Sequence, residues 1–102
     1  MGSAMRGRRT RLRERDGDLC FYCGSMMLFE PTWRKTGSRP FRVHPANEAT
    51  VEHLVDRQHG GSNDLTNLVL ACKGCNNGRN YMGLAEKLSS RLPSAPAKDT
   101  AA

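Results

Sequence analysis

The stretch that decides the fold is Thr50-Val51-Glu52-His53-Leu54-Val55, followed by Asn67-Leu68 and by Cys72-Lys73-Gly74-Cys75-Asn76. Together these segments place a carboxylate, an imidazole, two amides and a pair of thiols within one short span of chain. Carboxylate, imidazole and thiolate groups are the side chains that bind metal ions in proteins. The stretch therefore predicts that the protein binds metal ions, and the rest of the chain indicates which ions and for what purpose.

The four cysteines form two close pairs, Cys20-x-x-Cys23 and Cys72-x-x-Cys75. A chain of 102 residues with 37% hydrophobic and 6% aromatic content has a thin core, so one domain of this size needs a cross-link. Paired thiolates on tight turns favour tetrahedral binding of a structural Zn2+ ion. Disulfide bonds and an iron–sulfur cluster stay open as alternatives.

The ends of the chain are expected to lie outside the domain. Residues 1–5 read Met-Gly-Ser-Ala-Met and are interpreted as a cloning remnant, while residues 93–102 are rich in Pro, Ala, Ser and Lys and are predicted to be a disordered tail. The domain is therefore expected to span residues 6–92, with a core at about residues 18–80. The sequence shows no secretory pattern and no membrane-length apolar run, which favours a cytoplasmic location.

A net charge of +6 and a pI near 9.6 favour a polyanionic partner. Residues 6–16 contain six arginines but only one sizeable apolar residue, Leu12, so they predict a basic helix or arm that docks weakly and exposes its charge. This arm is expected to lie along a nucleic-acid backbone, although a solvated basic face is the plainer alternative. The candidate nucleic-acid-binding residues are Arg8, Arg9, Arg11, Arg13, Lys73 and Arg79.

The middle of the chain predicts short strands. Residues 26–30 and 41–44 are interpreted as the two strands of a hairpin, separated by turn-forming residues 36–40. Trp33 and Phe41 suit base stacking, but in so small a domain they are expected to contribute to packing instead.

The second half predicts a strand, a loop, a strand and a helix. Residues 49–55 are apolar and β-branched, residues 56–64 are polar and loop-forming, and residues 65–71 return to a strand-like pattern. A helix is expected to run from Cys75 to about Leu92, although two glycines weaken its early turns. Its apolar side chains have helical spacing: Leu84, Ala85, Leu88 and Leu92.

This order of elements, with a carboxylate–imidazole pair on the first strand and an asparagine at the start of the helix, resembles the HNH nuclease family. The resemblance spans about residues 18–80. It implies a small α+β domain of the zinc-stapled ββα-metal (His-Me finger) type that cleaves DNA with a divalent ion, leaving a 3′-hydroxyl and a 5′-phosphate. The residues that carry it are Glu52-His53, Gly60-Gly61, Asn67-Leu68, Cys72-x-x-Cys75 and Asn76-x-x-Arg79.

The residue types also suit phosphodiester hydrolysis, which needs charge neutralisation and an activated water. The Glu52 carboxylate and the Asn76 amide oxygen suit Mg2+, Mn2+ or another hard divalent ion. The resemblance implies that His53 is the general base, that Asn67 fixes the loop between the strands and that Arg79 holds the phosphate. On an ideal strand, His53 projects to the side opposite Glu52.

Three positions depart from the family pattern. The family more often has Asp at position 52, His at position 76 and Pro at position 56, where this chain has Glu52, Asn76 and Asp56. The expected partner is double-stranded DNA, bound with low sequence specificity by a monomer. The alternative function is a zinc-dependent nucleic-acid-binding module without catalysis.

Overall fold

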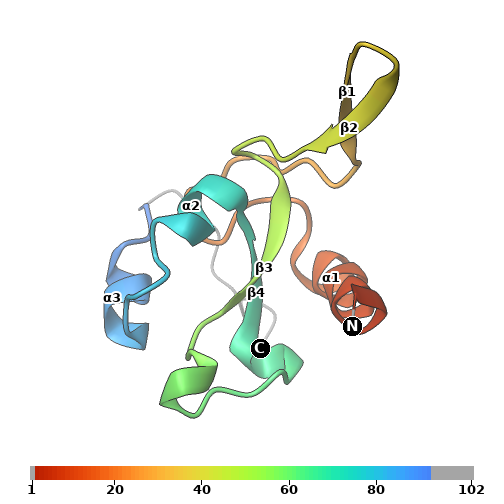
Figure 1. Cartoon of the computed structure of the whole chain (residues 1–102). Helices are drawn as coiled ribbons and strands as arrows, with labels where there is room; N and C mark the ends of the chain where they lie inside the picture. Colours follow the sequence, from red (N-terminus) through yellow and green to blue (C-terminus); the bar gives the residue numbers. More distant parts are fainter. Residues whose placement is uncertain (1, 93–102) are drawn as a thin grey trace.

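The structure is a computed structural model that describes residues 2–92, with side chains described from Gly7 onward. In Figure 1, β3 and β4 form a central ribbon with α1 on one side and α2 and α3 on the other, and a separate β1–β2 hairpin projects from one end. The elements are α1 (Gly2–Asp16), β1 (Thr32–Thr36), β2 (Arg39–Val43), β3 (Ala49–His53), β4 (Leu68–Cys72), α2 (Lys73–Asn77) and α3 (Leu84–Ser89).

The expected α+β class with a ββα order is confirmed. No helix of the described part is long and apolar enough to cross a membrane. Helix α1 already begins at Gly2, so the backbone of residues 2–5, interpreted above as a remnant, continues the helix. The tail expected at residues 93–102 lies outside the described residues.

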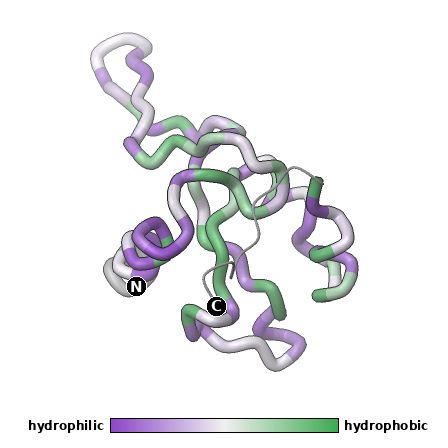
Figure 2. Tube along the Cα trace, turned by 180° about the vertical axis from the view of Figure 1, so that it is seen from behind, coloured by the Kyte–Doolittle hydropathy of each residue, from purple (hydrophilic) through white to green (hydrophobic). Residues whose placement is uncertain are grey.

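The core is built around β4. Strands β3 and β4 pair antiparallel, with Ala49 opposite Cys72 and His53 opposite Leu68. All five β4 residues are buried because apolar side chains occupy both faces of the strand. Figure 2 shows this apolar centre between more hydrophilic elements. The predicted second strand begins late, at Leu68, because residues 65–67 form a 3-10 turn.

Helix α1 docks more firmly than its composition predicts. Leu12 is fully buried, as expected for the one apolar contact of the helix. The arginines add hydrogen bonds to backbone carbonyls: Arg9 donates to Phe29 and Ala49, and Arg15 donates to Leu65 and Leu68. The expectation that this helix docks weakly is therefore wrong, because its arginines replace the missing apolar contacts. The expectation that it exposes most of its charge agrees with the structure, in which Arg11, Arg13 and Arg15 are exposed.

The hairpin also differs from its prediction. Its first strand is Thr32–Thr36 and not residues 26–30, which make only isolated bridges at Met26 and Leu28. The two-residue turn places Gly37 at a φ of 70°, a backbone conformation that glycine adopts without strain. Trp33 is 58% exposed and Phe41 46% exposed, so neither contributes to the core as expected.

The predicted C-terminal helix is divided into two short helices. Helix α2 ends at Asn77 and α3 begins at Leu84, because the glycine-containing segment between them interrupts the helix. The predicted apolar face does not enter the core: Leu84, Leu88 and Leu92 are exposed. The α3 side chain that is fully buried is Lys87.

Candidate metal centres and active site

The four cysteines come together although their two pairs lie about fifty positions apart in the sequence. Their sulfur atoms all lie within 4.8 Å of one another, and all four are free cysteines. A tetrahedral zinc–thiolate site with bonds of about 2.3 Å has sulfur–sulfur edges of about 3.8 Å. The cluster therefore fits one metal ion, and its all-thiolate chemistry favours zinc.

Backbone hydrogen bonds prepare this cluster for metal. The Cys20 sulfur accepts hydrogen bonds from the backbone N–H groups of Tyr22, Cys23 and Cys72. Such bonds stabilise a thiolate, the form of cysteine that binds metal. Burial alone would raise the pKa of the Cys23 thiol, but hydrogen bonds from the side chain and backbone of Ser25 lower it to about 7.

The loop between β3 and β4 is held by one amide. The Asn67 Oδ1 accepts a hydrogen bond from the Val55 N–H at 2.9 Å, and its Nδ2 donates to the carbonyls of Val55 and Ser62. Gly61 permits this arrangement, since a Cβ there would lie 1.7 Å from the Val55 carbonyl oxygen. Through these contacts Asn67 joins the two ends of the loop between β3 and β4.

We expect Asn67→Ala to lower the free energy of unfolding by about 2–3 kcal/mol, because it removes two partly buried hydrogen bonds and one exposed one, of about 1 kcal/mol each. Urea unfolding of the zinc-loaded protein measures this change. The matched control is Asn80→Ala, at an exposed amide with no hydrogen bond within residues 2–92. Equal stability of the two variants would contradict the role of Asn67.

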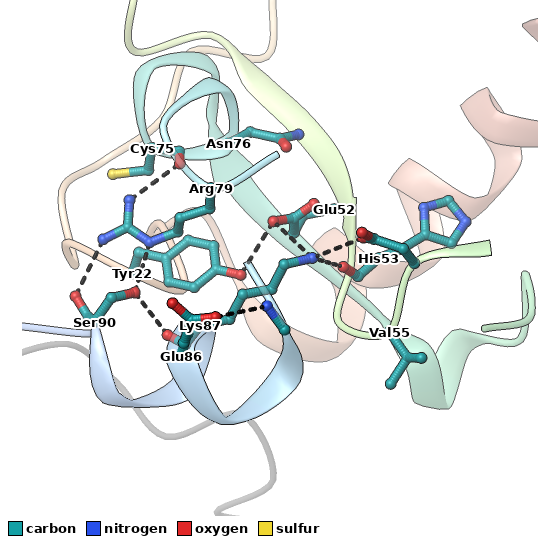
Figure 3. Close-up of polar contacts among 12 residues, drawn as sticks. Tyr22, Glu52, His53, Val55, Cys75, Asn76, Arg79, Glu86, Lys87 and Ser90 are labelled. Atoms are coloured by element: carbon teal, nitrogen blue, oxygen red, sulfur yellow. Dashed lines mark hydrogen bonds and ion pairs between the residues drawn. The ribbon is translucent and has the colours of Figure 1, made fainter. Parts of the chain in front are cut away.

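Glu52 is buried, with 6% of its surface exposed, on the side of β3 that faces α2 and α3. Its Oε2 accepts a hydrogen bond from the Tyr22 hydroxyl at 3.1 Å and lies 3.5 Å from the Lys87 ammonium (Figure 3). Burial raises the pKa of Glu52, although Lys87 and Tyr22 favour the ionised form. Its second oxygen, Oε1, makes no hydrogen bond or ion pair in the described part of the chain.

Lys87 is a site residue that the sequence analysis missed. Its ammonium donates to the His53 carbonyl at 2.6 Å and lies 3.2 Å from an oxygen of Asp56. Asp56, which stands where the family often has proline, thus supplies a second carboxylate for the buried ammonium. The sequence signal for such a residue is the pair of carboxylates Glu52 and Asp56, four positions apart, because two buried carboxylates need a cation as a partner.

Asn76 lies on the same side of the ribbon as Glu52. Its Nδ2 donates to the Thr50 hydroxyl at 2.9 Å and to the Val51 carbonyl at 3.4 Å, which leaves Oδ1 available. Thr50 and Glu52 are two positions apart on β3, so their side chains share one face. The available oxygens of Glu52 and Asn76 therefore fit a hard divalent ion, with Lys87 as a neighbouring cation.

His53 points the other way. Figure 3 shows its ring turned away from Glu52 and Lys87, as the alternation of strand side chains predicts. Its Nε2 lies 2.7 Å from Asn63 Oδ1, which as an acceptor requires the Nε2 proton. In the neutral ring, the lone pair is then on Nδ1. The structure thus places Glu52 and Asn76 on the same side of the ribbon and turns the His53 ring to the other side.

The predicted phosphate and nucleic-acid contacts are only partly available. Arg79 stacks on the Tyr22 ring and donates to Ser90 and to the Cys75 carbonyl, so phosphate binding by this side chain would require those contacts to break. Arg8, Arg9 and Arg13 also have partners within the domain. Arg11 is exposed and Lys73 half-buried, and the structure describes no hydrogen bond from either side chain.

Comparison with known proteins gives one match. Residues 20–81 match a family model described as HNH endonuclease. No curated protein and no solved structure matches the chain. The matched range contains all four cysteines, strands β3 and β4 with the loop between them, and α2, while α1 and α3 lie outside it.

Proposed function

Because the chain belongs to the HNH endonuclease family, we propose that it is a metal-dependent DNA endonuclease that hydrolyses phosphodiester bonds. The observation that carries this proposal is the pair of available oxygens of Glu52 and Asn76, on one face of the β3–β4 ribbon within the matched range. Two oxygen ligands with room for phosphate and water are typical of an open site for a hard divalent ion.

The protein is proposed to use two kinds of metal. Zinc in the four-cysteine cluster holds the fold, while Glu52 and Asn76 hold Mg2+, Mn2+ or another divalent ion. When bound, this second ion supplies positive charge that stabilises the phosphorane-like transition state and the leaving oxygen. Tyr22 fixes the Glu52 carboxylate, and Thr50 with the Val51 carbonyl fixes the Asn76 amide.

His53 is proposed as the general base. The hydrogen bond to Asn63 keeps the proton on Nε2, so Nδ1 accepts the proton of the attacking water. Asn63 is thus a positioning residue that fixes the tautomer of the imidazole. His53 and Glu52 are adjacent on β3 and face opposite sides of the strand. A phosphodiester that is cleaved with the help of both side chains must therefore cross β3 at these two residues.

The proposed substrate is double-stranded DNA. The net charge of +6 favours a polyanion, and exposed Arg11 and half-buried Lys73 offer charges for phosphate contacts. A domain of this size contacts few base pairs, which favours low sequence specificity.

We expect Asn76→Ala to weaken Mn2+ binding at the second site about tenfold or more, because it removes one of two protein oxygens. Titration of the zinc-loaded protein with Mn2+, followed by electron paramagnetic resonance, measures this affinity. The control Asn77→Ala alters the exposed neighbour on the same helix. Normal zinc content with an unchanged Mn2+ titration would remove Asn76 from the metal site.

One observation favours a second candidate function, a nucleic-acid-binding module without catalysis. The Lys87 ammonium already pairs with both Glu52 and Asp56, so each carboxylate has a structural partner that is not a divalent ion. In this case Lys87 fastens α3 to the ribbon, and the zinc cluster and the basic surface carry the function.

A plasmid-nicking assay distinguishes the two functions. The zinc-loaded protein is incubated with supercoiled plasmid and Mg2+, Mn2+ or no added divalent ion, and binding is followed on the same DNA. Cleavage that depends on added Mg2+ or Mn2+ supports the endonuclease. Binding without cleavage under every metal condition would overturn it in favour of the binding module.

A further inference from the structure

The β1–β2 hairpin is a strongly basic arm that the proposed catalytic chemistry does not use. Between residues 31 and 47 the sequence has four Lys or Arg residues and no Asp or Glu. The hairpin extends away from the ribbon, and its strands carry hydrophilic residues beside a turn of intermediate hydropathy (Figures 1 and 2). Its two aromatic side chains, Trp33 and Phe41, are largely exposed. The basic residues are Arg34, Lys35, Arg39 and Arg42.

The strand register distributes these side chains over both faces of the hairpin. Residues that are directly opposite in an antiparallel pair lie on the same face, and faces alternate along a strand. Trp33 pairs with Arg42 and Arg34 pairs with Phe41. One face therefore carries Trp33, Lys35 and Arg42, and the other carries Arg34, Arg39 and Phe41. Each face has one aromatic ring and two cations.

The Trp33 face borders an open groove of about 970 Å3 between the hairpin, α1 and β3. Arg9 lies on the α1 side of this groove, and Thr50 and Val51 lie on its β3 side, next to the Glu52-His53 pair. Arg42 is only loosely held, since its guanidinium lies 3.4 Å from Glu48 and its buried Nε has no hydrogen-bond partner in the described structure. The groove thus connects the basic hairpin with the proposed catalytic strand.

We propose that the β1–β2 hairpin enters a groove of duplex DNA and directs one phosphate backbone along the groove beside β3. This inference rests on the proposed function, because it assigns the surface that binds the proposed substrate. Two-stranded β-ribbons fit the major groove, which is about 12 Å wide. Strands of five residues extend about 17 Å, which is long enough to reach into it.

The charge pattern selects duplex DNA over a single strand. A ribbon in a duplex groove has a phosphate backbone on each side, so cations on both of its faces make contacts. A ribbon that binds one strand uses the cations and the stacking aromatic residue of one face only. The absence of acidic residues between positions 31 and 47 also disfavours a second copy of the hairpin as the partner, because like charges would repel; the carboxylate at the base of the hairpin, Glu48, is already paired with Arg42 and His44.

Trp33 reports directly on this contact because it is the only tryptophan of the chain. The zinc-loaded protein, without added Mg2+ or Mn2+, is titrated with a 25-base-pair duplex whose binding is followed by the anisotropy of a dye on the DNA. We expect bound duplex to reduce acrylamide quenching of Trp33 fluorescence at least twofold. Unchanged quenching at saturation would overturn the proposal, as would equal affinity and protection with a single-stranded oligonucleotide.

The charges of the hairpin tip are tested by Arg34→Gln/Lys35→Gln/Arg39→Gln, at three exposed side chains. With about 0.9 counterions released per phosphate contact, the slope of log affinity against log salt is expected to fall by about 2–3, and the affinity at 100 mM salt by at least tenfold. Arg39→Gln is compared with Arg57→Gln, which removes an exposed charge in the loop after β3. Equal losses from these two single variants would contradict a specific hairpin contact.

Zinc content and circular dichroism verify that each variant is folded. Protection of Trp33 by DNA and cleavage of plasmid DNA are measured separately, so each can succeed while the other fails. Duplex binding that protects Trp33 without plasmid cleavage would support the hairpin and overturn the endonuclease. Metal-dependent cleavage with an unprotected Trp33 would overturn the hairpin and support the endonuclease.

Discussion

Removal of the metal from the four-cysteine cluster is expected to unfold the domain. The cluster joins the turn before the hairpin to the end of β4, and the core around it consists of few large apolar side chains. Binding of a structural zinc ion contributes about 10–16 kcal/mol to the free energy of folding at pH 7. The whole stability of a small domain is usually about 5–15 kcal/mol, so the zinc contribution is at least comparable with it. A strong chelator therefore leaves no folded protein.

Metal analysis and circular dichroism measure this effect. The purified protein is expected to contain about one zinc ion per chain, and its β-sheet and helix signals are expected to disappear with chelator and return with zinc. Cys72→Ser, at a buried ligand, is expected to have the same effect as the chelator. A phosphine reductant alone serves as the control, since it breaks disulfides and offers no thiolate that competes for zinc. Unfolding by the reductant, or a folded zinc-free protein, would contradict the prediction.

Replacement of His53 by alanine is expected to lower the rate of DNA cleavage by a factor of about 100 to 10,000, the range that general bases contribute. The side chain faces away from Glu52 and Asn76, so the variant is expected to bind Mn2+ and zinc normally. Single-turnover cleavage of plasmid at saturating protein measures the chemical step separately from binding.

His59→Ala is the matched control because it removes the other imidazole of the β3–β4 connection. The His59 side chain is 68% exposed and lies 3.7 Å from Asp56, outside the proposed machinery. The His59→Ala variant is expected to cleave DNA at the wild-type rate. Equal rates for His53→Ala and the wild type would exclude His53 as the base, even if the protein remains a metal-dependent nuclease.

The sequence predicts the ribbon well because its signals are local. Residues 49–53 contain the β-branched pair Thr50 and Val51, and residues 68–72 are continuously apolar, so both strands follow from composition. The hairpin was misplaced because several windows between residues 26 and 44 have similar strand propensity. The turn at Gly37 and the paired register select Thr32–Thr36, and register is a tertiary property.

Part of the site follows from the sequence, and part requires tertiary contacts. The cysteine spacing predicts the cluster, and strand alternation predicts that Glu52 and His53 face opposite sides. Helical periodicity, in contrast, predicts a buried face of leucines where the structure buries Lys87. Glu52 at the end of β3 and Asp56 in the following loop favour a cation over an apolar side chain at position 87. The helical spacing of apolar residues in α3 carries no information about these two carboxylates.

The wide separation of the two cysteine pairs has a kinetic consequence. In the unfolded chain each pair lies within four residues and binds an ion locally, whereas the complete site requires closure of a loop between positions 49 apart. At up to one zinc ion per chain, a single ion binds both cysteine pairs. Above that, separate ions occupy the two pairs, and one ion must dissociate before the loop closes. Refolding is therefore expected to slow as zinc rises above stoichiometry.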